Sequence, residues 1–599
     1  MRRIFTFAVF LLLALPANAH QKPWIEVRSP HFRVLTNGSL NDARHLAKEF
    51  EQMRYVLADR YPQFRLEGGA PLTILAALDE STAKSLEPML WNSKQVKPAG
   101  IFHHGWEKEY ALVRLDTMTG EGANEIVYHE YTHTVFRLNF QYLPVWLDEG
   151  LANFYGYTRF QDHKIYVGAL PPRYGMPGTS LIPVETLINV SQSSNYYRDE
   201  SKVYQFYAES WALVHYLIFG PGMERGKHLN QFTALLQQGR DQAQAFQQVF
   251  GDPKDVDRAL AAYLSKASLQ NAILPDPTQI DEKSFTSRTM SAAETDAELA
   301  SYHIWTRDFE DAKSLIKQAL KDDPKLGLAH EMAGFLDFWD GKDGEALKEF
   351  TQASALDGKL PLALFAKTMM SPIAVSDAAA DEDAFRAALL QVLELNPQFA
   401  LAYVQLARLA LRQNDLERAF GLSRKAEELD PSLAGYHIQS GEILLRMGKG
   451  AEAASFAKFV AQRWTRTDHD EAVELWNAIP FEQRPPGETL SMSVWEGMQS
   501  LGGSVKSVAC SGPDGDITLV LNDRGRTLIF RGQHTFWGFS DTIWYGFDHF
   551  NQCHHLEGMR AVVHFRPALD ASYAGELVDV DIRNDLPAAA AKDRAQATP

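Results

Sequence analysis

Two neighbouring stretches decide the fold of the first half of this chain: Tyr128-His129-Glu130-Tyr131-Thr132-His133 and Trp146-Leu147-Asp148-Glu149-Gly150-Leu151-Ala152. His129 and His133 are four residues apart, so on a helix both imidazoles project from one face. Two neutral imidazoles in that arrangement can hold one Zn²⁺ at about 2.0–2.1 Å. Glu130 follows the first histidine directly, and its carboxylate is expected beside the metal, where it can take a proton from water.

A catalytic zinc site needs a third protein ligand and one open position. Glu149 is the expected third ligand, on a second helix that Pro144 starts at its first turn. The HExxH pattern fixes only three positions, so the alternative is a helix with ordinary buried or surface histidines. Ile126, Val127 and Phe136 make this helix apolar, however, and paired ionisable groups are costly there unless they bind something.

The HEYTH and WLDEGLA sequences resemble those of the gluzincin metallopeptidases, the group that holds thermolysin and the aminopeptidase N type. The resemblance covers about Trp24 to Leu269 and is strongest to exported bacterial proteins that join such a domain to tetratricopeptide repeats. It implies an α+β catalytic domain over residues 24–272 with Glu130 as the general base. It also implies one Zn²⁺ per chain, held by His129, His133 and Glu149. Fifteen residues separate His133 from Glu149, a few fewer than in thermolysin, which shortens the turn between the two helices.

The same resemblance gives Tyr207 a catalytic role. In aminopeptidase-type gluzincins a downstream helix begins with a tyrosine whose hydroxyl stabilises the tetrahedral oxyanion. Tyr207-Ala208-Glu209-Ser210 lies in that register, within a helix expected over Val203 to Phe219. The alternative is a core tyrosine on an apolar stripe with Tyr204 and Trp211.

Residues 1–19 are expected to be a cleavable signal peptide. Arg2 and Arg3 precede an apolar run from Phe5 to Leu15, which is too short to span a bilayer, and Ala17-Asn18-Ala19 is a typical cleavage pattern. This predicts a periplasmic or secreted protein. No other apolar run reaches 18 residues, so no membrane span is expected.

The composition is that of a large globular protein with several domains: 599 residues, 45% hydrophobic and 23% charged. The formal net charge is −17 and no lysine- or arginine-rich run occurs, so nucleic-acid binding is disfavoured. An α/β layer is expected before the metal helix, with a hairpin over Ile101 to Leu115. In gluzincins a comparable edge strand holds the peptide; an ordinary sheet strand fits equally well. The loop-rich residues from Gly156 to Tyr197 are expected either to shape the substrate cleft or to pack as an irregular lid.

The second half of the chain is repetitive. After an expected linker over residues 273–290, helix pairs end at Asp323-Pro324, Asp357-Gly358, Asn396-Pro397 and Asp430-Pro431. The spacings of 34, 39 and 34 residues match the tetratricopeptide period, with five extra residues in one repeat near Ser376 to Asp381. About five repeats are expected within an all-α solenoid over residues 291–480, which would bind protein partners.

Residues 490–583 change to alternating strands and predict a small all-β domain, either a five-stranded barrel or a sandwich. It contains Cys510 and Cys553, the only cysteines of the chain. In an exported protein a disulfide between them is expected, with two reduced buried thiols as the alternative. Residues 584–599 are expected to be a disordered tail.

Together these patterns predict a multidomain, exported zinc peptidase acting on peptides or proteins, with repeats that recruit its substrates. The alternative belongs to another class: a periplasmic scaffold or chaperone-like binding protein whose metal site is structural or vestigial. Glu130 argues against that alternative, because a structural zinc site needs no general base and usually fills its fourth position.

Overall fold

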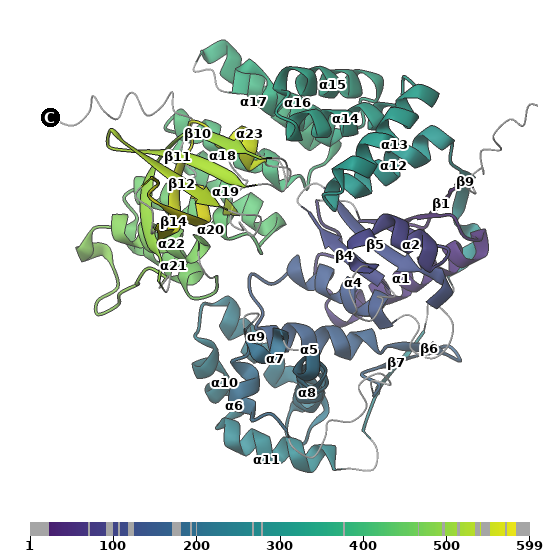
Figure 1. The fold of residues 1–599 in the computed structure, drawn as a ribbon. Coiled ribbons are helices and arrows are strands. Elements are labelled where there is room, and N and C mark those ends of the chain that lie inside the picture. Colours follow the sequence, from purple (N-terminus) through teal and green to yellow (C-terminus); the bar gives the residue numbers. More distant parts are fainter. Residues whose placement is uncertain are drawn as a thin grey trace, which may run out of the picture.

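The computed structural model describes most of the chain. The described residues are 23–69, 72–91, 100–105, 108–117, 125–170, 181–191, 194–198, 200–265, 269–276, 280–374, 378–464, 467–493, 497–511, 516–532, 539–540, 551–568 and 572–582. The expected signal peptide and the expected C-terminal tail lie outside them. Figure 1 shows a sheet-and-helix region, an arc of paired helices, and a small barrel beside the later helices.

A mixed six-stranded sheet organises the first region, in the order β4-β5-β3-β2-β1-β9. The strands are β1 (Ile25–Arg28), β2 (Arg33–Thr36), β3 (Leu72–Ala77), β4 (Gly100–His104), β5 (Glu109–Arg114) and β9 (Thr286–Thr289). β2, β3 and β5 run parallel, while β1, β4 and β9 are antiparallel to their neighbours. β4 and β5 form the predicted hairpin, and β4 is an edge strand.

Helices cover both faces of this sheet, because successive strand side chains point to opposite faces. Val34 and Ile74 lie in the main core with α1 (Leu40–Arg60) and α4 (Glu125–Arg137). Leu35 and Leu75 point the other way, into a second core. That core is completed by α2 (Glu80–Leu86) and α12 (Ala292–Trp305). Since α12 is the first repeat helix, the repeats are fused to the sheet through a shared core.

A helical layer follows α4 and holds the second metal-ligand stretch. α5 (Val145–Gly156) packs against α4 and against the long α8 (Glu200–Phe219). A Cβ atom at Gly150 would lie 2.6 Å from the Ser210 carbonyl oxygen, so only glycine allows this approach of α5 to α8. The remaining elements of the region are α3 (Pro88–Trp91), α6 (Val184–Ile188), α7 (Asn195–Arg198), α9 (Lys227–Gln237), α10 (Gln242–Phe250), α11 (Pro253–Leu264), β6 (Arg159–Gln161) and β7 (Lys164–Val167).

Two parts of residues 273–290, expected to form a linker, are strands of the first region instead. β8 (Ala272–Pro275) pairs with β7, and β9 adds the last strand to the main sheet beside β1. Arg288 on β9 also donates to the carboxylate of Glu26 on β1. Both strands are short and β9 is exposed along its whole length, so the segment carries no hydrophobic alternation to predict it.

Five helix pairs follow in the described residues, as the repeat period predicts. After α12 they are α13 (Phe309–Asp322), α14 (Gly327–Trp339), α15 (Asp343–Leu356), α16 (Pro361–Met370), α17 (Ala379–Leu395), α18 (Ala400–Arg412), α19 (Leu416–Leu429), α20 (Ala434–Arg446) and α21 (Gly450–Ala461). α22 (Thr467–Ala478) packs on the last pair. The extra residues of the long repeat fall between α16 and the start of α17. Figure 1 shows the pairs stacked into an arc.

The C-terminal domain is a closed barrel. Its strands are β10 (Gln499–Cys510), β11 (Ile517–Asp523), β12 (Arg526–Gly532), β14 (Arg560–Pro567) and β15 (Gly575–Ile582). β12 pairs with β15 and closes the ring, which settles the choice between barrel and sandwich. A two-residue strand, β13 (Phe539–Ser540), lies beside β15.

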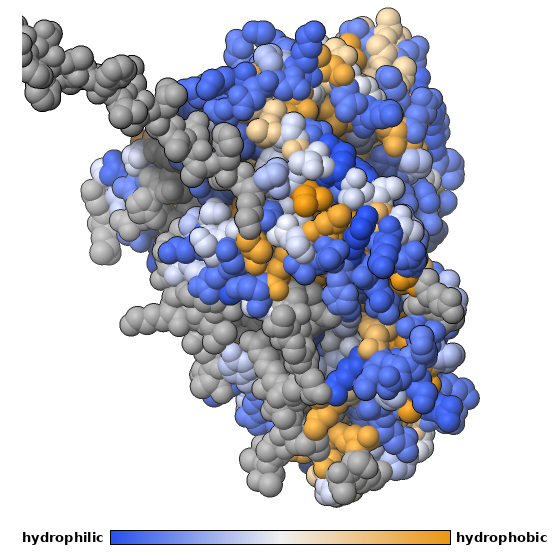
Figure 2. Space-filling view, turned by 90° about the vertical axis from the view of Figure 1, so that its right-hand side faces the viewer, coloured by the Kyte–Doolittle hydropathy of each residue, from blue (hydrophilic) through white to orange (hydrophobic). Residues whose placement is uncertain are grey.

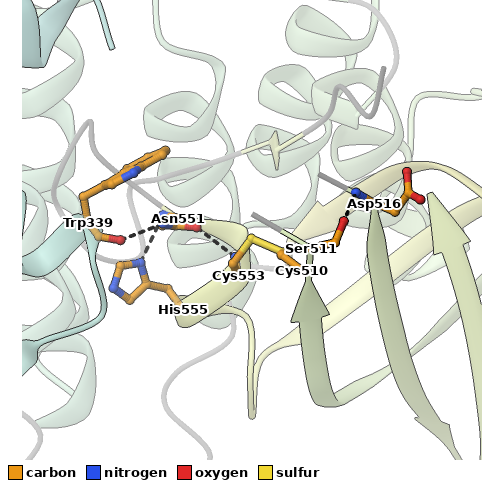
Figure 3. Close-up of a disulfide and its surroundings, with 7 residues drawn as sticks. All are labelled: Trp339, Cys510, Ser511, Asp516, Asn551, Cys553 and His555. Atoms are coloured by element: carbon orange, nitrogen blue, oxygen red, sulfur yellow. Dashed lines mark hydrogen bonds between the residues drawn. A yellow bond between two sulfur atoms is a disulfide. The ribbon is translucent and has the colours of Figure 1, made fainter. Parts of the chain in front are cut away.

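Cys510 and Cys553 form the predicted disulfide, which ties the end of β10 to α23 (Gln552–His555) (Figure 3). The residue before this helix also docks the barrel on the repeats. Asn551 Nδ2 donates a hydrogen bond of 2.6 Å to the carbonyl oxygen of Trp339, at the end of α14. The disulfide therefore stabilises a contact between domains as well as the barrel itself.

The outer surface is largely hydrophilic on the face shown in Figure 2, with hydrophobic residues in small scattered groups. Among the described helices, none has the length and apolar character needed to cross a membrane.

Candidate metal centre

Local sequence explains why α4 presents its two histidines to one side. Val127, Tyr131 and Val135 are spaced four residues apart and are all buried in the main core. His129 and His133 occupy a neighbouring face of the same helix, and their side chains are 17% and 18% exposed. Burial of the apolar face thus fixes the direction in which both imidazoles point.

The structure brings the three expected ligands together. His129 Nε2 lies 3.1 Å from His133 Nε2. Glu149 Oε2 lies 3.5 Å from the first of these atoms and 3.6 Å from the second. Two ligand atoms at about 2.0–2.1 Å from a tetrahedral ion are separated by roughly 3.3–3.4 Å. The three distances lie within a few tenths of an ångström of that value, so the donor set fits a zinc ion.

Asp148, next to Glu149 in the sequence, contacts one of the two histidines. Its Oδ1 lies 3.0 Å from Nδ1 of His133, and a hydrogen bond there requires Nδ1 to carry the proton. In the neutral ring Nε2 is then unprotonated, and its lone pair points towards Glu149 and His129. Asp148 therefore selects the tautomer of His133 that can bind a metal.

The electrostatics of the centre favour a cation. Burial acts to lower the pKa of His133, but the carboxylates of Asp148 and Glu149 outweigh it and raise that pKa well above its ordinary value. Burial likewise acts to raise the pKa of Glu149, and the two imidazoles reverse this and lower it far below its usual range. Two carboxylates thus face two imidazoles in a mostly buried site, where a positive charge is stabilised.

Glu130 and Tyr207 line the same cleft as the three ligands. Tyr207 stands on α8 and is partly buried, with its ring 5.9 Å from that of Phe206. Asn153, one turn beyond Glu149, is buried, and within the described part of the chain its Nδ2 has no hydrogen-bond partner.

The cleft has a volume of about 1120 Å³ and is built from distant parts of the chain. Ile188, the last residue of α6, and Asn189 to Ser191 after it form part of its wall. Ser432, Arg463, Trp464 and Asp468 also line it, and they come from the repeat domain. No local pattern could have identified these four residues, because their position depends on how the repeats curve back. The role of Asp148 could have been predicted from the sequence, since it lies in the first turn of α5 and directly precedes the ligand Glu149.

No protein-family model and no curated protein matches this chain. Among solved structures it is similar to PilF of Pseudomonas aeruginosa, with 17% identity, a TM-score of 0.28, and coverage of 32% of this chain and 85% of PilF. A tetratricopeptide protein of Thermus thermophilus has 16% identity and a TM-score of 0.26, covering 31% and 98% of the two chains. One from Parabacteroides merdae has 12% identity and a TM-score of 0.25, covering 42% and 85%. At these scores the similarities say nothing about the metal centre.

Proposed function

We propose that this chain is a zinc-dependent peptidase whose repeats help to bind protein substrates. The observation that carries the proposal is the spacing of the three donor atoms, 3.1 to 3.6 Å apart, beside a glutamate that lines the same cleft. A purely structural zinc site would need neither the glutamate nor an open cleft.

The residues divide the chemistry among them. A zinc ion held by His129, His133 and Glu149 would supply an acidified water molecule and polarise the scissile carbonyl. Glu130 accepts a proton from the attacking water and returns it to the leaving amine. Tyr207 donates a hydrogen bond to the oxygen on which negative charge develops.

The size of the cleft supports a peptide substrate. Its volume of about 1120 Å³ exceeds the range of small-ligand pockets, which is about 300–1,000 Å³. The edge strand β4 lies in the layer next to α4, and an extended peptide could add to the side of β4 on which no described strand pairs with it. We therefore expect extended segments, such as those of unfolded proteins, to be cleaved in preference to folded domains.

The test combines metal content with turnover. Elemental analysis of the purified mature protein should find about one zinc per chain, and casein should be cleaved unless a chelator is present. Glu130→Gln should lower turnover by about 10²–10⁴-fold with the zinc content unchanged. Glu125→Gln is the matched control, because Glu125 lies on the same helix but does not line the cleft.

A Glu130→Gln protein that cleaves as fast as the wild type would refute the mechanism. A wild-type protein that holds zinc, cleaves nothing and still complements a deletion strain would favour the scaffold function. The helix pairs support that second function independently, since solenoids of this kind present extended binding surfaces.

A further inference from the structure

The repeat domain closes one side of the metal cleft. Two of its inter-helix turns reach the wall: the α19–α20 turn contributes Ser432, and the α21–α22 turn contributes Arg463 and Trp464. Asp468, in the first turn of α22, lies on the same wall. A peptide bound along the metal centre therefore meets side chains of the repeats as well as those of α4 and α5.

Arg463 is held firmly in this wall. Its Nη1 donates to the carbonyl oxygen of Phe459, 3.0 Å away, and its Nη2 donates to that of Leu236 at 3.1 Å, across the boundary between the domains. The guanidinium also lies over the ring of Phe459, 4.1 Å from its centre, and 5.8 Å from the ring centre of Tyr142. Two carbonyls and two rings orient the group without neutralising its charge.

Among the described residues, no carboxylate lies within 4.0 Å of Arg463, and Asp468 on the same wall forms no ion pair with it. The charge of Asp241 acts on the guanidinium only from a longer distance. Arg137, which also lines the cleft, differs because it pairs with Glu109 and Asp430. Burial lowers the pKa of Arg463 to about 10, which leaves it charged at neutral pH but poorly hydrated. A partly buried cation of this kind is costly unless an anion joins it.

We infer that Arg463 binds a carboxylate of the substrate, so that the repeat domain selects peptides with a free carboxyl terminus or an acidic side chain in this part of the cleft. The inference rests on the proposed peptidase function for the use of the cleft. Its chemistry is that of a charge-assisted hydrogen bond between guanidinium and carboxylate, which the planar donor array of arginine favours. Arg463 is thus a specificity-determining residue supplied by a domain other than the one that holds His129, His133 and Glu149.

The test measures binding, so that it does not depend on turnover. Full-length mature Glu130→Gln protein, loaded with zinc, is titrated into three fluorescein-labelled peptides followed by anisotropy. One peptide without acidic residues carries a free carboxyl terminus, the second is its amide, and the third is an amide with one internal glutamate. We expect the free acid or the glutamate peptide to bind about 10–100-fold more tightly than the plain amide. Which of the two binds identifies the source of the carboxylate.

Adding Arg463→Gln should abolish this preference by weakening the carboxylate peptide alone. Arg484→Gln is the matched control, because Arg484 lies in the same region, also donates to two backbone carbonyls and does not line the cleft. It should keep the preference. Asp468→Asn removes a negative charge from the same wall and should strengthen binding of the carboxylate peptide.

The inference is overturned if all three peptides bind equally to the Glu130→Gln protein, or if Arg463→Gln weakens all three alike, as a structural clamp would. Weaker binding of the carboxylate peptide by Asp468→Asn also overturns it. If Arg463→Gln does not fold, Asp468→Asn provides the test in its place. Should the wild type cleave no peptide while the binding preference persists, the peptidase function fails and the carboxylate site stands.

Discussion

His133 and His215 lie in the same domain with opposite surroundings. His133 faces Asp148 at 3.0 Å and Glu149 at 3.6 Å, which raise its pKa well above the ordinary value. His215, on α8, is fully buried, and burial lowers its pKa to about 4. Its Nε2 donates to the carbonyl oxygen of Gly168 at 3.1 Å, and its Nδ1 accepts from the hydroxyl of Tyr263 at 2.8 Å.

The difference distinguishes a ligand from a core histidine. At His215 both ring nitrogens are satisfied by neutral groups, so the ring has nothing left to offer a metal. At His133, Nδ1 is hydrogen-bonded to a carboxylate, and Nε2 points at two further metal-ligand atoms, those of His129 and Glu149. A metal ion can therefore replace a proton at Nε2. The sequence alone does not distinguish the two residues, because both lie in apolar helices.

The largest effect should come from exchanging each histidine. His133→Ala removes a direct ligand, so zinc affinity should fall by more than the roughly 10–100-fold that loss of a ligand's hydrogen-bond partner costs. Hydrolysis should disappear with the metal. His215→Gln should retain about one zinc per chain and lose stability instead, by about 1–3 kcal/mol, because it disturbs two buried hydrogen bonds. Zinc analysis and thermal melting of both variants test these two expectations. Equal zinc loss in the two variants would contradict them.

The second effect is on the pH dependence of stability. A folded pKa of about 4 against about 6.5 when unfolded means that the unfolded state binds more protons between these values. The contribution of His215 is therefore fully present above pH 6.5 and is lost as the pH falls towards 4, by about 3 kcal/mol. Denaturant unfolding of wild type and His215→Gln across this range should give curves that converge at acid pH. Parallel curves would show that His215 titrates normally.

The parts that the sequence predicted are those fixed by local periodicity. The histidine pair on α4 follows from spacing four, and the repeats follow from a period that the helix pairs reproduce. The strands in residues 273–290 were missed because β9 is short and exposed throughout. The bond from Asp148 to His133 depends on how α5 crosses α4, and the place of Arg463 in the cleft depends on the curvature of the whole arc. Neither distance is encoded in a local pattern.

A third effect should come from the contact between α5, which carries Glu149, and α8, which carries His215. Gly150 follows Glu149 on α5, and a methyl group there would meet Ser210 and Val214 of α8 at 2.6 Å. Because the Ser210 contact is a backbone carbonyl, Gly150→Ala must push the helices apart, at a cost of about 1–3 kcal/mol, and should weaken zinc binding through Glu149. Gly421→Ala is the matched control: it lies within α19 with open space around it and should stabilise by up to about 1 kcal/mol. Equal melting temperatures for the two variants would contradict this account.

The smallest effect should come from Asp148→Asn. Asparagine can still accept the hydrogen bond from His133 Nδ1, so the tautomer is kept and only the negative charge is lost. The Asp148 side chain is 39% exposed, and solvent screens such a charge, so we expect zinc affinity to fall by only about tenfold, the lower end of the usual range for such partners. Competition with a chromophoric chelator measures this fall, and turnover at saturating zinc should return close to the wild-type rate. Asp148→Ala, which also removes the acceptor, should lose more affinity than Asp148→Asn. If both variants bind zinc as tightly as the wild type, then burial and Glu149 alone position His133, and the contrast with His215 rests on the ligands rather than on their hydrogen-bond partner.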